Sequence, residues 1–314
     1  MRTIHARYGL RSGPYGLAII NTMTTTLPDI PNTPVTIHTI RQCVRQGEKF
    51  AVLTAYDATT AGWISRGGVQ VLLVGDSAAQ MMLGFEQTIH APLEFMLTIT
   101  AAVKRGAPRC LVIGDMPFMS YQADDAEAIR NAGRFMTEGF ADAVKIEVDD
   151  SYAPLVEKMA RASIPVIAHI GWRPQRSVKV GVPVVAGRTE QSIEQLVNLA
   201  TLMQASGAAM LLIEQSTAQA SQRVVDSVKI PVIGCGAGPA CHGHVVILHD
   251  WLGLTQWHPS FVQPITNGGQ QLCELAQKWN QLVRSGDYLK HDHPYKMNTD
   301  LAQSTDDSHP GTPR

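Results

Sequence analysis

Ionisable side chains follow most of the short apolar runs in this sequence. In chain order they are Asp57, Asp76, Asp115, Lys145 with Glu147, His169 and Glu214. A helix cap explains one such carboxylate, but it does not explain six successive runs that end in this way. Where parallel strands end on one side of a closed barrel, groups far apart in the sequence become neighbours. The pattern therefore predicts one polar site built from several strand ends.

Crowded carboxylates repel one another in a dry site, and an oxygen-binding cation relieves that repulsion. Mg²⁺ suits this set better than Zn²⁺, because zinc requires His or Cys ligands that the set supplies only once. A cation with open positions would bind the carboxylate and ketone of a 2-oxo acid, acidify the adjacent C–H and stabilise an enolate. Glu214, lying opposite, remains free to act as a base.

The elements that must position these groups alternate along the chain from Phe50 onward. Eight apolar, β-branched runs read as strands: Phe50–Tyr56, Val69–Gly75, Arg109–Gly114, Ala143–Ile146, Pro165–Ala168, Ala208–Ile213, Ile230–Gly234 and the weaker Val245–Leu248. Strands of nearly continuous apolar character are typical of parallel sheets buried on both faces. The fold class is therefore predicted to be α/β, a closed (βα)8 TIM barrel rather than an open doubly wound sheet.

Amphipathic segments separate the strands, and several begin at Asp, Ser or Thr and end at Gly. They are Ala58–Arg66, Leu93–Arg105, Asp124–Glu138, Ser151–Ala162, Glu190–Ser206 and Ala218–Ser227, with a further helix from about Gln270 to Arg284. We expect a barrel domain over residues 36–288. Residues 1–35 are expected to be a disordered extension, and residues 289–314 a disordered tail rich in His, Asp, Ser and Pro.

Composition narrows the function classes. The chain has 314 residues, 45% of them hydrophobic, and a formal net charge of −1 with no dense basic block. We therefore expect a small-molecule substrate and neither a nucleic-acid nor a membrane partner. Five cysteines without a CxxC pair favour a reducing compartment, and a cytoplasmic location is expected. Residues 1–28 lack acidic residues, so a mitochondrial transit peptide is the alternative to an extended start upstream of Met23.

Several local motifs occur together. They are Val74–Ser77, Gly114–Met119, Val144–Glu147, His169–Gly171 with Pro174–Gln175, and Gly236–Gly238 followed by His249–Asp250. In combination they resemble the ketopantoate hydroxymethyltransferase (3-methyl-2-oxobutanoate hydroxymethyltransferase) family of the phosphoenolpyruvate/pyruvate barrel superfamily. The similarity covers about residues 36–260.

The resemblance implies a role for each side chain of the predicted site. Asp76 and Asp115 would ligate Mg²⁺, Glu147 would bind it through water, Ser77 and Lys145 would hold the substrate carboxylate, His169 would lie beside the substrate, and Glu214 would be the catalytic base. The enolate of 3-methyl-2-oxobutanoate would then attack the methylene carbon of 5,10-methylenetetrahydrofolate to give 2-dehydropantoate, a step of pantothenate biosynthesis. A homo-oligomer, by resemblance a decamer, is also implied.

Simpler interpretations stand beside these roles. Lys145 would serve only to neutralise the carboxylates, Ser77 only to cap the following segment, and His169 only as a satisfied core residue. Two short motifs also have alternatives. Cys241–His244 suggests a zinc site but lacks a well-spaced fourth ligand. Gly234–Gly238 suggests a dinucleotide fingerprint, but a glycine turn fits better because no acidic strand end follows at the right distance.

The sequence departs from the family pattern in segments that would line the pocket: Ile89–Pro92, Ile99, the flap Gly181–Gly187, His242–His244, and the surroundings of Phe261, which lack basic residues. Altered substrate choice on a retained mechanism would produce changed lining around unchanged metal and base positions, so a divergent paralogue that performs the same chemistry on a more apolar 2-oxo acid is the alternative to 3-methyl-2-oxobutanoate. A catalytically silent barrel scaffold is the alternative from another class. The stacked carboxylates argue against it, since a scaffold has no need of them.

Overall fold

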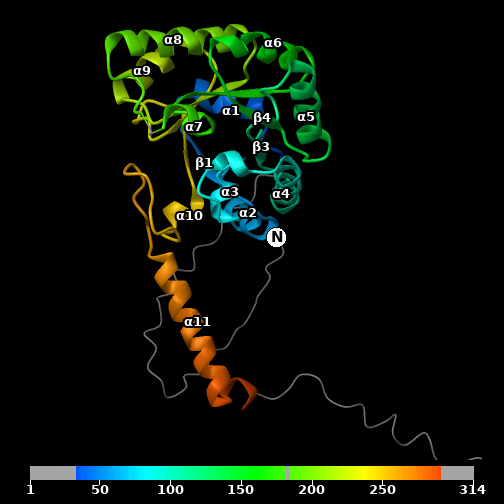
Figure 1. Cartoon of the computed structure of the whole chain (residues 1–314), viewed down its shortest axis with the longest axis vertical. Coiled ribbons are helices and arrows are strands. Elements are labelled where there is room, and N and C mark those ends of the chain that lie inside the picture. The colour runs from blue at the N-terminus through cyan, green and yellow to red at the C-terminus, as the bar shows by residue number, and fades with distance from the viewer. Residues whose placement is uncertain (1–32, 182–183, 291–314) are drawn as a thin grey trace, which may run out of the picture.

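The computed structural model describes residues 33–181 and 184–290, and within them the chain forms a closed barrel. Eight parallel strands pair in sequence order and the last pairs with the first, while helices cover the outside (Figure 1). The predicted (βα)8 barrel is therefore confirmed. The expected disordered segments lie almost entirely outside the described residues.

The strands overlap the predicted runs. They are β1 (Phe50–Thr54), β2 (Val71–Val74), β3 (Leu111–Asp115), β4 (Ala143–Glu147), β5 (Val166–Gly171), β6 (Met210–Glu214), β7 (Val232–Cys235) and β8 (Gly243–Val246). Strand β5 extends three residues beyond its predicted end, and β8 is displaced: the prediction for it was two residues late. Leu248 instead begins a short helix, and its backbone N–H donates to Thr54 Oγ1 at 3.0 Å, which turns the chain out of the sheet.

The longer helices also follow the predicted pattern. The helices are α1 (Ile37–Arg45), α2 (Ala58–Arg66), α3 (Ala78–Met81), α4 (Leu93–Gly106), α5 (Asp125–Thr137), α6 (Ala153–Arg161), α7 (Ser177–Val180), α8 (Glu190–Ala205), α9 (Ala218–Ser227), α10 (Leu248–Trp251) and α11 (Gly268–Ser285). Four 3₁₀ turns accompany them: η1 (Thr88–His90), η2 (Asp150–Tyr152), η3 (Pro174–Arg176) and η4 (Asp287–Lys290). The predicted helix Ser151–Ala162 is thus divided into η2 and α6. Among the described residues, no helix is long and apolar enough to cross a membrane.

The inside of the barrel is filled by side chains from alternate strand positions. The apolar ones form a cluster of their own: Phe50, Val52, Val71, Leu73, Leu111, Ile113, Ala143, Ile167, Met210, Leu212, Ile233 and Val245. Helix α1 lies at the amino-terminal end of the strands, where Val35 and Ile40 belong to the same cluster. The sequence analysis did not predict α1. Its Ile40 is fully buried and closes the bottom of the barrel, so polar groups are confined to the other end.

The polar end continues the same inward-facing rows. Two residues after inward-facing Ile113, Ala143 and Ile167 come Asp115, Lys145 and His169, and Glu214 follows Leu212 in the same way. Because side chains alternate along a strand, these four point into the barrel mouth. The strand register then aligns Asp115 with Lys145, and Glu147 with His169.

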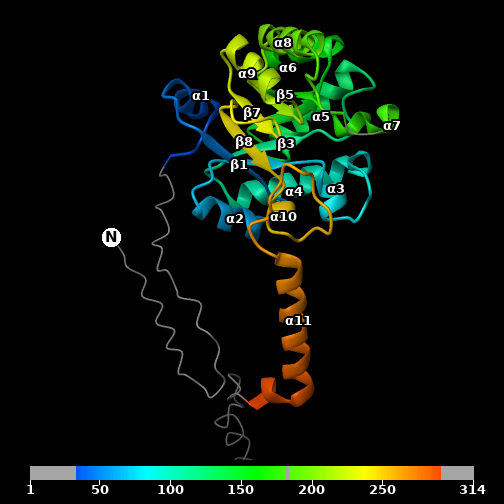
Figure 2. The ribbon, with the colours of Figure 1, turned by 90° about the vertical axis from the view of Figure 1, so that its left-hand side faces the viewer.

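Helix α11 projects from the barrel, as both views show (Figures 1 and 2). It falls within the predicted range 36–288 but does not form part of the barrel wall. Leu272, Leu275, Trp279 and Val283 repeat every three or four residues, which places them on one face of the helix, and each is at least half exposed, from 50% to 63%. Trp279 packs edge-on against Tyr288 of η4.

An exposed apolar stripe of this kind is typical of a surface that is covered in an assembly. We predict that the protein self-associates through α11 and that Leu275→Glu lowers its molar mass in solution, measured by light scattering after size exclusion. Gln281→Glu, on the opposite face of the helix, is the matched control and should leave the mass unchanged. A monomeric unaltered protein, or an unchanged mass for Leu275→Glu, would contradict this prediction.

Candidate active site

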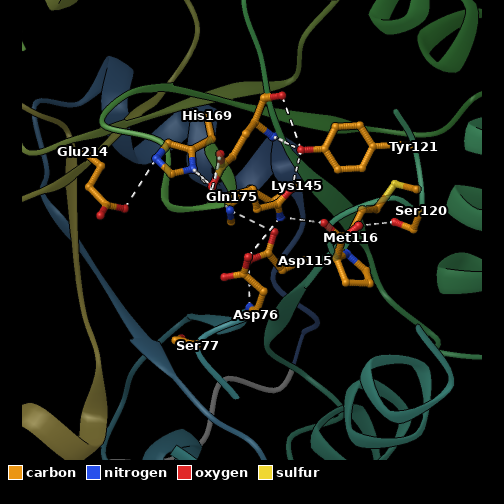
Figure 3. Close-up of polar contacts among 12 residues, drawn as sticks. Asp76, Ser77, Asp115, Met116, Ser120, Tyr121, Lys145, His169, Gln175 and Glu214 are labelled. Atoms are coloured by element: carbon orange, nitrogen blue, oxygen red, sulfur yellow. Dashed lines mark hydrogen bonds and ion pairs between the residues drawn. The ribbon is translucent and has the colours of Figure 1, made fainter. Parts of the chain in front are cut away.

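A buried lysine lies at the centre of the polar end of the barrel (Figure 3). Lys145 Nζ is 2.8 Å from Asp115 Oδ1 and 3.2 Å from His169 Nδ1, and the Lys145 side chain is only 5% exposed. Burial disfavours the charged amine, but the attraction of Asp115, Asp76 and Glu147 outweighs burial and raises the pKa of Lys145. Lys145 is therefore a permanent cation at the centre of the site.

The lysine also fixes the state of His169. An ammonium group has only donors, so Nδ1 of His169 accepts its hydrogen bond and the imidazole proton resides on Nε2. Burial and the charge of Lys145 hold the pKa of His169 well below its usual range, so the ring is neutral. The Nε2 atom lies 3.4 Å from Glu214 Oε2. The N–H group of His169 therefore faces the carboxylate of Glu214.

Glu214 ends β6 and stands apart from the two aspartates, on the other side of His169 (Figure 3). Its side chain is 21% exposed, which is more than that of any other residue in the ion pairs of His169 and Lys145. Burial raises the pKa of Glu214 to about 7, although Lys145 opposes that rise. Gly171 allows this placement, because its φ is +88° and a Cβ atom there would lie 2.3 Å from the Glu214 carbonyl oxygen. The group can exchange a proton near neutral pH.

Asp76 and Asp115 lie on the opposite side of Lys145. The backbone N–H of Asp76 donates to Asp115 Oδ2 at 2.9 Å, and both residues are buried. Burial raises the pKa of Asp115 to about 8, with Lys145 opposing and Asp76 reinforcing the shift. Glu147 is also buried, and burial likewise raises its pKa well above the usual value. Without a further positive charge, this group of carboxylates resists full ionisation.

Two residues that the sequence analysis did not assign tie these carboxylates together. The Gln175 side-chain amide donates to Asp76 Oδ2 at 2.9 Å, and its backbone N–H donates to both Glu147 oxygens at 3.1 and 3.2 Å. The Tyr121 hydroxyl donates to Gln175 Oε1 at 2.7 Å and accepts from the Glu147 backbone N–H at 3.0 Å. Pro174–Gln175 is one of the family motifs in the sequence, so the sequence did indicate that Gln175 belongs near the site. Nothing in the sequence near Tyr121 indicated its role.

Ser77 and Asp57 differ in whether their side chains cap the helix that follows. Ser77 makes no side-chain cap to α3; its hydroxyl is hydrogen-bonded to the Tyr56 hydroxyl at 2.9 Å, so the capping interpretation is wrong. Asp57 does cap α2, because its Oδ1 accepts from the Thr60 backbone N–H at 2.8 Å. Asp57 is therefore the one strand-end acid of the predicted set that serves a helix.

The donor set is compatible with a hard divalent cation. No group of three or more His, Cys, Asp or Glu side chains suited to a metal occurs in the described part of the chain, so Glu147 does not complete a three-carboxylate cage. Apart from its ion pair with Lys145, Asp115 Oδ1 is buried without a hydrogen-bond partner there. Mg²⁺ characteristically uses one or two carboxylates with water and substrate oxygens. Asp76 and Asp115 fit that requirement, and Glu147 fits a place behind them.

The alternative motifs are structural. His242 Nδ1 accepts from the Val232 backbone N–H at 3.0 Å, next to the amino end of β8 and far from the carboxylates along the strands, and His244 is exposed. The zinc interpretation of Cys241–His244 therefore has no support. Gly236 and Gly238 have φ of 59° and 72°, as a glycine turn after β7 requires. Two residues of the flap, 182–183, lie outside the described part.

Solved structures define the class of fold. A phosphonopyruvate hydrolase, solved in complex with oxalate and Mg²⁺, superposes with a TM-score of 0.57 at 13% identity, covering 85% of this chain and 94% of its own. 2,3-dimethylmalate lyase, described as a member of the PEP mutase/isocitrate lyase superfamily, gives 0.54 at 18%, covering 80% and 89%. The chain therefore shares the barrel fold of these two enzymes.

Sequence relatives identify the family within that class. The profile of the family Ketopantoate hydroxymethyltransferase matches residues 34–291. The 3-methyl-2-oxobutanoate hydroxymethyltransferase of Trichlorobacter lovleyi is 38% identical over 83% of this chain and 98% of its own. The enzyme of that name from Syntrophobacter fumaroxidans is 40% identical over 79% and 89%. The chain belongs to the ketopantoate hydroxymethyltransferase family, which confirms the resemblance drawn from the motifs.

The bond between Tyr121 and Gln175 should stabilise the fold measurably. Gln175→Ala leaves the buried Tyr121 hydroxyl and Asp76 without that partner, so we predict a loss of about 1–3 kcal/mol in the free energy of unfolding. Urea denaturation of Gln175→Ala, Tyr121→Phe and the double variant measures the coupling, expected at about 0.5–3 kcal/mol. Gln222→Ala, which removes only an exposed bond to Asp226, is the control. Strictly additive losses would show that the two side chains act independently.

Proposed function

We propose that this protein transfers a hydroxymethyl group from 5,10-methylenetetrahydrofolate to the enolate of a 2-oxo acid, with 3-methyl-2-oxobutanoate as the substrate and 2-dehydropantoate as the product. The observation that carries the proposal is the pairing of a partly open Glu214, whose pKa is raised to about 7, with a permanently charged Lys145 across a neutral His169. Membership of the ketopantoate hydroxymethyltransferase family supports it.

In this proposal the chain's own residues divide the work between binding and proton transfer. Lys145 attracts the carboxylate of the 2-oxo acid, and the Ser77 hydroxyl donates to it. Glu214 removes the proton from the carbon next to the ketone. The Nε2–H group of His169, 3.4 Å from Glu214 Oε2, faces the carboxylate and favours its ionised form before the transfer. The same lysine keeps His169 neutral, so the imidazole does not compete for the proton.

Asp76 and Asp115 would hold Mg²⁺, with Glu147 behind them. When bound, Mg²⁺ supplies a Lewis acid that acidifies the C–H next to the ketone. Gln175 orients Asp76 and Glu147, and Lys145 limits how strongly the carboxylates repel one another. Carbon–carbon bond formation then joins the enolate carbon to the one-carbon unit, water provides the hydroxyl oxygen, and tetrahydrofolate leaves.

Deuterium uptake at the carbon next to the ketone isolates the first half of this reaction. In D₂O with Mg²⁺ and no folate, the unaltered protein should exchange that proton of 3-methyl-2-oxobutanoate. Glu214→Gln should slow exchange by about 10²–10⁴-fold, the usual contribution of a positioned base. Exposed Glu194→Gln on α8 is the control. Exchange by Glu214→Gln at the full rate would exclude Glu214 as the base. Faster exchange of a bulkier 2-oxo acid would favour the paralogue.

The pH dependence of exchange follows from the same carboxyl group. A base must be ionised to act, so the rate should rise with pH and level off above the pKa of Glu214. That pKa is about 7 without a cation nearby, and a bound Mg²⁺ would lower it, so the midpoint should fall at or below about 7. Rates between pH 5 and 9 provide the measurement. A rate that falls as pH rises through 7 would require an acid instead.

Metal dependence tests the two aspartates. We predict that Asp76→Ala and Asp115→Ala each abolish Mg²⁺-dependent exchange while the circular dichroism spectrum is retained, since both side chains point into the barrel mouth. After chelation, Mg²⁺ should restore activity and Zn²⁺ should not, because the expected ligands are oxygen atoms. Stoichiometric zinc that tracks with activity would overturn the assignment, as would a normal Mg²⁺ response in either variant.

A further inference from the structure

A cavity of about 360 Å³ adjoins the active site on the side of β4 and β5. Loops that follow β3, β4 and β5 line it, and Glu147 and Gln175 contribute to both the cavity and the carboxylate site. The proposed reaction, as assigned so far, uses neither the aromatic nor the basic residues of this lining. Only the Gln175 side chain would separate a ligand in the cavity from Asp76, because Gln175 is hydrogen-bonded to Asp76.

The cavity carries an excess of positive charge. Arg173, Arg176 and Lys179 line it together with two carboxylates, Glu147 and Asp149. Asp149 Oδ2 lies 3.7 Å from the Arg173 guanidinium and 3.1 Å from that of Arg176, so one carboxylate serves two cations. Even with both carboxylates ionised, three cations leave the lining net positive. The site therefore attracts an anion.

The three cations differ in how free they are. Arg173 also donates to the Val148 carbonyl oxygen at 2.6 Å, which fixes it in the wall. Both Glu147 oxygens accept from the Gln175 backbone N–H, so Glu147 is turned towards that residue. Lys179 is exposed and makes no ion pair or hydrogen bond with the residues that the structure describes. Among the described residues Lys179 is thus unpaired, and Arg176 shares its one carboxylate partner, Asp149, with Arg173, so these two cations keep positive charge for a ligand.

Aromatic rings form much of the remaining lining. Phe118 is 39% exposed and Tyr152 is half-buried, while buried Tyr121 lies edge to face behind Tyr152 with ring centroids 5.8 Å apart. Flat aromatic walls favour a planar aromatic group, which stacks or packs against them. A cavity that combines such walls with two available cations selects a ligand with an aromatic ring and a carboxylate.

We propose that this cavity binds the p-aminobenzoylglutamate part of the tetrahydrofolate donor, with the ring against Phe118 and Tyr152 and a glutamyl carboxylate on Arg176 and Lys179. The inference rests on the proposed function and adds the binding site of the second substrate. A dicarboxylic 2-oxo acid would also bring a carboxylate, but it has no ring for the aromatic wall. The substrate carboxylate itself is already matched by Lys145.

Calorimetric titration with p-aminobenzoyl-L-glutamate tests the site without turnover. The unaltered protein should bind it, and binding should weaken as NaCl increases. Arg176→Ala and Lys179→Ala should each weaken binding by about tenfold, the effect of losing one charged contact worth about 1.4 kcal/mol. Arg161→Ala removes an exposed arginine on α6, away from the cavity, and is the matched control. Ethyl p-aminobenzoate, which lacks the carboxylates, should bind more weakly.

The outcomes separate this inference from the proposed function. Deuterium exchange by the unaltered protein without folate reports on the 2-oxo acid chemistry alone. If no exchange occurs but the probe still binds in the cavity, the proposed function is contradicted and the cavity assignment is not. No binding of the probe by the unaltered protein, or equal binding by Arg176→Ala and Lys179→Ala, would overturn the cavity assignment. Displacement of the probe by 2-oxoglutarate at lower concentration than by folate would also overturn it, in favour of a dicarboxylic substrate.

Discussion

The ion pair between Lys145 and Asp115 is the interaction on which the site depends. A buried cation requires carboxylate partners, and here the partners are buried too, so removing either member alone would cost about 3–5 kcal/mol. The same ammonium group sets the imidazole tautomer, since it leaves Nδ1 of His169 no role except acceptor. One side chain therefore pairs with Asp115 and fixes the proton position of the histidine.

The carboxylates of the site lie in two chemical environments. Asp76 and Asp115, next to Lys145 and held by Gln175, are suited to an oxygen-binding cation. Glu214 lies beyond His169 and is more open, and burial raises its pKa to about 7. Burial raises the pKa of Asp115 as well as that of Glu214, so the position and openness of each carboxylate, rather than its pKa, separate the two environments.

The barrel makes this separation possible because it fixes the depth of each group. Helix α1 closes the amino end, apolar side chains fill the middle, and the charged residues occupy only the last inward-facing layer. Asp115, Lys145 and His169 are thereby buried, and Glu214 is the partly open member of this layer. The adjoining cavity begins where this layer ends, so Glu147 and Gln175 belong to both. A second substrate bound there would meet the first across that shared wall.

The sequence by itself determined the barrel and most of the charged layer, because nearly continuous apolar runs and the polar residue that ends each run are local properties of the chain. It also supplied the family motifs around Asp76, Asp115, Glu147 and His169. The tertiary structure decided which strand-end acids join the site: Asp57 caps a helix, although locally it resembles the others. It also decided the contacts of Tyr121 and the projection of α11, since packing between distant segments sets both.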